Sequence, residues 1–108
     1  MSRDIRESDW KVIRDLKPLA LARYCERVLA EVVVLASDES VGSHERYLAV
    51  FKLIDQRDGT LAHAFNGLSR SCALQKLTAM CALDLITEDE LRLLSAQMRE
   101  SVHFLLGR

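Results

Sequence analysis

Residues 18–36, PLALARYCERVLAEVVVLA, carry an apolar helical pattern that no glycine interrupts. Their apolar residues return at steps of three and four, which is the spacing of one helix face. Apolar positions cover well over half of the circumference, so we expect this helix to be the centre of the core. A strand over residues 32–34 is the alternative, because consecutive valines favour strands. The helical period before them has no breaker, which favours the helix.

Pro18 is expected to separate this helix from an earlier one over residues 8–16. Ser8 is a suitable N-cap for the earlier helix. Lys17 precedes the proline and is therefore pushed out of the helical region. Pro18 itself suits the first position of the next helix, where its missing N–H is not needed.

A second long helix is expected over residues 44–65, after a loop at residues 37–42. Its apolar period passes through Gly59 without a slip, although glycine costs about 1 kcal/mol relative to alanine. A break at Asp58–Gly59 remains the alternative. Asn66 and Gly67 form a suitable C-terminal stop.

Three shorter helices are expected in the C-terminal third, over residues 69–83, about 88–95 and 96–106. Residues 87–90 form a capping box, Ser95 can cap the last helix, and Gly107 can close it. The sequence therefore predicts an all-α fold and a single domain over residues 1–108. The expected architecture is an irregular bundle of five or six helices with one long central helix at about 44–65, antiparallel to the 18–36 helix.

The composition indicates an ordinary globular protein with no charge bias. The chain has 108 residues, of which 49% are hydrophobic, and its net charge is −1. This balance gives no long-range attraction to nucleic acid or to anionic lipid. The sequence contains neither an apolar run of membrane-spanning length nor a leader-like N-terminus. We therefore expect a cytoplasmic protein without membrane contact.

No motif for catalysis or metal binding stands out. Cys25, Cys72 and Cys81 are far apart, lie on apolar helical stripes and are expected to be buried, reduced thiols. No histidine has ligand spacing to them. We therefore expect no enzyme, no metal and no cofactor. A helical-bundle pocket for a small ligand or an enzymatic reaction, built around Asp55, Asp58 and Arg46, is an alternative.

The preferred hypothesis is a non-enzymatic adaptor or regulatory module that associates with itself as a homodimer or with another protein. The last helix ends in consecutive apolar residues that cannot all face one core, and an apolar surface patch usually marks a contact. Isolated exposed leucines in a monomer are the competing interpretation. The residues expected at the contact are Phe104, Leu105 and Leu106, with Tyr47 and Phe51 lining a groove.

A nucleic-acid-binding module is the second alternative, although we expect nucleic acid to be an improbable partner. Basic side chains around an aromatic ring can follow a phosphate backbone and stack a base. Interleaved acidic residues and the even charge balance count against this, and Trp10 is better interpreted as a core anchor beside Ile13 and Leu16. The residues concerned are Arg3, Arg6, Trp10, Lys11, Arg14 and Lys17.

Overall fold

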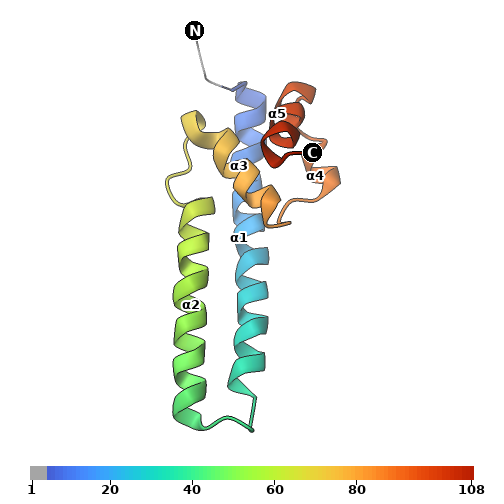
Figure 1. The fold of residues 1–108 in the computed structure, drawn as a ribbon. Helices are drawn as coiled ribbons and strands as arrows, with labels where there is room; N and C mark the ends of the chain where they lie inside the picture. Colours follow the sequence, from blue (N-terminus) through green and yellow to red (C-terminus); the bar gives the residue numbers. More distant parts are fainter. Residues whose placement is uncertain (1–4) are drawn as a thin grey trace.

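The computed structural model describes residues 5–108 and confirms the all-α fold, with no strand in that range (Figure 1). Five α-helices follow one another along the chain, and a 3₁₀ turn, η1, precedes α3. Their bounds are α1 Glu7–Ala36, α2 Ser43–Phe65, η1 Arg70–Cys72, α3 Ala73–Ala82, α4 Glu88–Leu91 and α5 Ala96–Leu106.

α1 continues through Pro18, so the expected break between residues 8–16 and 18–36 was wrong. Proline in a helix interior costs about 3 kcal/mol, because it removes a hydrogen bond to the carbonyl four residues earlier. Here that carbonyl belongs to Arg14, and both residues are exposed, so water can satisfy it. Burial of one continuous apolar face on both sides of the proline outweighs the cost. The buried apolar residues of that face are Ile13, Leu16, Ala20 and Tyr24.

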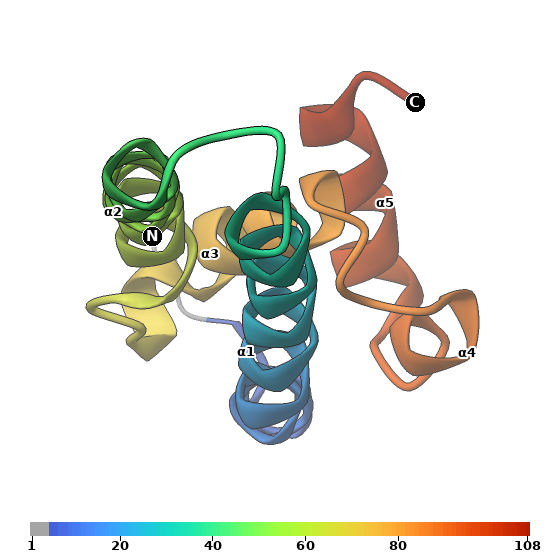
Figure 2. The same ribbon diagram turned by 90° about the horizontal axis from the view of Figure 1, so that it is seen from below.

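α2 is continuous through Gly59, as its apolar period predicts, and the alternative break is absent. It ends at Phe65, and Gly67 follows with a φ of 73°, a left-handed conformation that suits glycine. α2 is nevertheless not the central helix. α1 is longer, with 30 residues against 23, and α2, α3 and α5 surround it (Figure 2).

The C-terminal third confirms most of the expected helix ends. The capping box at Thr87 is present, the Ser95 hydroxyl accepts a hydrogen bond from the Met98 N–H, and Gly107 closes α5 with a φ of 76°. The helix expected over residues 69–83 is divided into η1 and the shorter α3. α3 ends in a Schellman motif, in which Asp84 adopts a left-handed φ of 57°.

The molecule consists of a head and a projecting arm (Figure 1). In the head, residues 5–24 and 64–108, α3 and α5 pack beside the first half of α1 around two apolar clusters. The arm, residues 25–63, is an antiparallel hairpin of the rest of α1 and most of α2, and none of its residues is buried. The radius of gyration is 17.0 Å, whereas a compact chain of this length has about 13 Å. The expectation that residues 18–36 form the core centre therefore holds only for their first turns.

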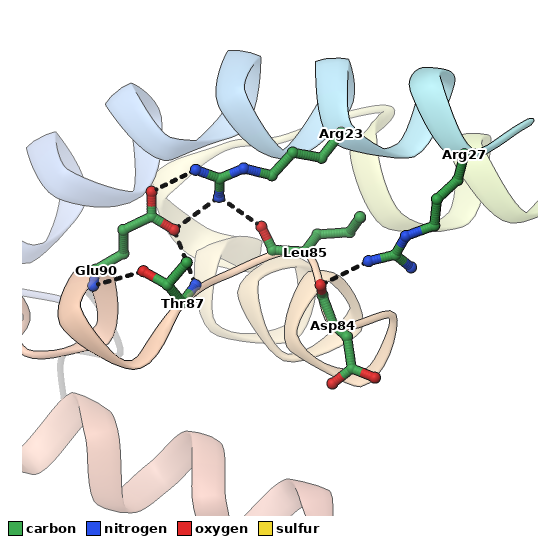
Figure 3. Close-up of polar contacts among 6 residues, drawn as sticks. All are labelled: Arg23, Arg27, Asp84, Leu85, Thr87 and Glu90. Carbon is green, nitrogen blue, oxygen red and sulfur yellow. Dashed lines mark hydrogen bonds and ion pairs between the residues drawn. The ribbon is translucent and has the colours of Figure 1, made fainter. Parts of the chain in front are cut away.

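A polar clamp fixes the base of the arm to the head (Figure 3). The Arg23 guanidinium donates to both carboxylate oxygens of Glu90 at 2.7 and 2.8 Å, and to the carbonyl of Leu85 at 2.8 Å. One turn later, Arg27 donates to the carbonyl of Asp84 at 2.7 Å. These bonds satisfy carbonyls at the end of α3, which would otherwise lack donors. The clamp thus marks the level at which α1 leaves the head.

Candidate interaction surface

The exposed side of α1 carries little charge from Pro18 onwards. From Pro18 to Ala36, eleven residues are exposed and only Glu26 and Arg27 carry charge. The solvent face of a helix is normally polar, so an apolar stripe of this length needs a cover. The exposed fractions of Val33 and Val34 are 62% and 71%. The uncharged exposed residues are Pro18, Leu19, Ala22, Cys25, Leu29, Ala30, Val33, Val34 and Ala36.

α2 contributes a second apolar row along the same arm. Tyr47, Phe51 and Ile54 are spaced at three and four residues, and each is exposed, Tyr47 by 68% and Phe51 by 63%. An open apolar groove of about 330 Å³ lies between the two helices. We call this side of the hairpin the arm face. Its main residues are Cys25, Leu29 and Val33 of α1 with Tyr47, Phe51 and Ile54 of α2.

Polar contacts hold the hairpin together where apolar packing is thin. The Arg57 guanidinium donates to Glu31 at 2.9 Å, and the Tyr24 hydroxyl donates to the Arg57 carbonyl at 3.0 Å. Near the tip, Arg46 donates to the Ala36 carbonyl at 2.8 Å, which caps the end of α1. The two helices thus stay paired although no third element covers them.

The loop between α1 and α2 carries its own local structure. The hydroxyl and the backbone N–H of Ser40 both donate to the Asp38 carboxylate. These hydrogen bonds, with the hydroxyl as the main cause, hold the pKa of Asp38 below its usual value. The carboxylate therefore stays ionised, which keeps negative charge at the tip of the arm.

The structure places the expected contact residues at two ends of the molecule. Phe104 is 81% exposed and Leu105 is 50% exposed on α5, whereas Leu106 is half-buried and packs against the head core. Tyr47 and Phe51 lie near the tip of the arm, far from α5 (Figure 1). The two groups therefore cannot form one surface within a single molecule.

The basic residues near the N-terminus do not surround a free aromatic ring. Trp10 is half-buried and packs against the head core that contains Ile13, as expected for an anchor. Arg3 lies outside the described residues. The remaining basic residues are exposed at Arg6, Lys11 and Arg14 and half-buried at Lys17.

The residues of the proposed small-ligand pocket do not converge. Asp58 lines the groove between α1 and α2 beside Arg57, and Arg46 lines a separate hollow nearer the tip. Asp55 is exposed and lines neither of these two hollows. The chain therefore does not bring these side chains together for acid–base work.

The three cysteines are free and occupy different environments. Cys25 is exposed, so its expected burial was wrong, because no third helix covers the arm. Cys72 is half-buried, and a hydrogen bond with the Ser69 hydroxyl is the main cause that lowers its pKa. Cys81 is buried, as expected, and burial raises its pKa to about 11, which leaves the thiol unreactive.

Two other kinds of site are absent within residues 5–108. No group of three His, Cys, Asp or Glu side chains there could hold a metal ion. No helix in the same range combines the length and the hydropathy needed to cross a membrane.

The sequence interpretation missed the α1 half of the arm face. Leu29 and Val33 lie on the apolar face that is expected to form the centre of the core, although an apolar surface wider than half a helix exceeds what one neighbour can cover. That width is the signal that identifies them.

Comparison of the chain with protein-family models, curated proteins and solved structures finds no match.

Proposed function

We propose that this protein is a non-enzymatic interaction module that associates with itself through the arm face. The observation that carries the proposal is the uncharged stripe of α1, which lies beside the apolar row of α2 on a hairpin with no buried residue. Few polar groups interrupt this surface, so covering its apolar area is favourable by roughly 25 cal/mol per Å².

The size of the surface suits a stable dimer. The stripe from Pro18 to Ala36 is about 28 Å long at 1.5 Å per residue, and two helices side by side are about 20 Å wide. Its footprint is roughly 560 Å² on each copy, or about 1,100 Å² in total, which exceeds the roughly 1,000 Å² expected of a specific interface. The chain of 12.2 kDa exposes 7196 Å², whereas a compact monomer of this mass exposes about 6,100 Å².

A second copy of this chain is the partner that covers the arm face. Two antiparallel helices make one layer, and a helix layer is stable when another layer covers its apolar side. The α1 stripe of a second copy, packed against this one, supplies that layer. Such an interface is isologous, because the same face is used by both copies, and two-fold dimers are the commonest closed assemblies.

Sedimentation velocity over a range of micromolar concentrations tests the proposal. We expect a dimer for the unmodified chain and at least tenfold weaker association for Val33→Glu and for Phe51→Glu, because each places a charge in the contact. Both side chains are more than 60% exposed in the single chain, so circular dichroism and the melting temperature of the monomer should not change.

Phe104→Glu is the matched control, since Phe104 is even more exposed but lies on α5. It should associate as the unmodified chain does. A strict monomer at high micromolar concentration contradicts self-association. A Phe104→Glu monomer together with a Val33→Glu dimer would assign the contact to the end of α5 and overturn the role of the arm.

A further inference from the structure

We infer that the two copies lie antiparallel, with the α1 stripe of one against the α1 stripe of the other and each acidic arm tip beside the basic N-terminal half of its partner's α1. This inference rests on the proposed self-association and adds which parts of the partner are contacted. It also gives a role to Lys11 and Arg14, which the packing of the head does not use.

The inference is based on the order of basic, apolar and acidic residues along one face of α1. At 100° per residue, Lys11, Arg14, Leu29 and Ala36 all lie within about 40° of Cys25. The face is therefore basic near Lys11 and Arg14, apolar from Pro18 to Ala36, and it leads into a loop with acidic residues. The acidic residues around the tip are Asp38, Glu39 and Glu45.

Between Lys11 and Ala36 the head leaves the exposed residues of this face uncovered, although Leu21 at its edge packs against the head core. Three buried α1 residues, Ile13, Leu16 and Ala20, point about 120° or more away from Cys25. Lys11 and Arg14 are exposed. A partner helix can therefore continue past the arm without meeting α3 or α5.

Charge selects the antiparallel arrangement. The arm carries seven acidic and four basic residues, net −3, whereas the head residues 5–24 and 64–108 carry eight acidic and ten basic residues, net +2. A parallel pair would place two acidic tips together, and like charges repel. An antiparallel pair places each acidic tip near a basic region.

The spacing also fixes a register. Lys11 lies fourteen residues before Cys25, and the acidic loop follows the last α1 residue, which is eleven residues after Cys25, so a two-fold axis at Cys25 brings this loop towards Lys11 of the other copy. The same axis pairs Arg14 with Ala36 at the end of α1, next to the loop that carries Asp38 and Glu39. Glu7 also lies on this face, but its carboxylate is paired with Arg70 at 2.7 Å.

Disulfide mapping tests orientation and register together. In a chain whose Cys25 and Cys72 are replaced by serine, Ala36→Cys alone should give no covalent dimer with a thiol oxidant. A mixture of that chain with one carrying Arg14→Cys should give the mixed dimer, and restored Cys25 should link to itself. Cross-linking of Ala36→Cys to itself, with none in the mixture, would show a parallel pair and overturn the inference.

Charge reversal gives an independent readout. Lys11→Glu with Arg14→Glu should weaken the dimer at least tenfold, and so should Glu39→Lys with Glu45→Lys. Combining all four changes in one chain should restore most of the affinity, which a merely structural effect would not do. Added salt should weaken the unmodified dimer, because the attraction between tip and partner is exposed and screened.

The outcomes separate the two proposals. If the unmodified chain is a monomer, both proposals fail. If it is a dimer that Val33→Glu disrupts but the charge reversals leave unchanged, self-association stands and the antiparallel inference fails. If the reversal at Lys11 and Arg14 instead abolishes salt-sensitive retention on heparin while the dimer is unaffected, these residues serve nucleic-acid binding and the inference is overturned.

Discussion

The carboxylate of Asp9 holds the start of α5 through Ser95, which lies 86 residues away in the sequence. It accepts a hydrogen bond from the Ser95 N–H at 2.8 Å and from the Ser95 hydroxyl at 2.6 Å. Asp9 is only 3% exposed and is the one buried charged residue in the described part of the chain. A buried carboxylate is favourable when its oxygens are hydrogen-bonded, so this contact joins the two ends of the head.

Replacing Asp9 by alanine should lower the free energy of unfolding by about 2–3 kcal/mol, because the buried Ser95 N–H loses its partner and a charge-assisted bond is removed. Urea unfolding at neutral pH measures this. Asp15→Ala, at an exposed position of the same helix, is the control and should change the stability by less than about 0.5 kcal/mol. Equal effects of the two substitutions would contradict the role of Asp9.

The Arg23–Glu90 ion pair should make stability depend on acid. The hydrogen bond with Arg23 is the main cause that lowers the pKa of Glu90 from 4.5 to about 2. The carboxylate therefore stabilises the fold fully above pH 4.5, and this contribution is lost as the pH falls from about 4.5 towards 2. The Arg23 side chain is 38% exposed, so screening limits the contribution to about 1 kcal/mol.

Urea unfolding of Glu90→Gln and the unmodified chain at a series of pH values measures this contribution. Their difference should be largest near neutral pH and should shrink below pH 4.5. Glu88→Gln, an exposed neighbour, should show no such pH-dependent difference. A Glu90→Gln effect that is the same at pH 7 and pH 3 would exclude the ion pair as its cause.

Asp84→Gly should raise the stability by about 0.5–1 kcal/mol. A non-glycine residue at positive φ costs about 1–2 kcal/mol, and glycine at this position removes that strain. The larger entropy of glycine in the unfolded chain offsets part of the gain in stability. The contact with Arg27 uses the backbone carbonyl, so the substitution keeps it. Thermal unfolding checks the sign, and Asp89→Gly, inside α4, should have the opposite effect.

Pro18→Ala should stabilise α1 by about 1–2 kcal/mol, because it restores the N–H donor to the Arg14 carbonyl and removes a poor helix former. The loss of the stiff proline from the unfolded chain offsets part of this gain. Pro18→Gly restores the same donor but should gain about 1 kcal/mol less. The comparison is best made in the Val33→Glu background, so that association does not contribute. If Pro18→Ala gave no gain in stability, the helix would already accommodate the proline at this position without cost.

Residues whose roles depend on their neighbours in the chain were predictable from the sequence. The helical period of residues 44–65, the capping box at Thr87, the N-cap at Ser95 and the close at Gly107 all appear as expected. These signals are local, because the donors, acceptors and apolar steps lie within a few residues of one another. They determined that the chain is all-α and where most of its helices end.

The tertiary structure alone decided the continuity at Pro18 and the exposure of the arm. Pro18 is a local break signal, but the head that packs against Ile13 and Ala20 on either side of it outweighs that signal. Cys25, Leu29 and Val33 carry the same apolar signal as Ala20 and Tyr24, yet only the latter two are buried. The difference is the reach of the head, whose contacts with α1 end near Arg27, where its guanidinium bonds to the Asp84 carbonyl. No local pattern states where a distant helix will stop.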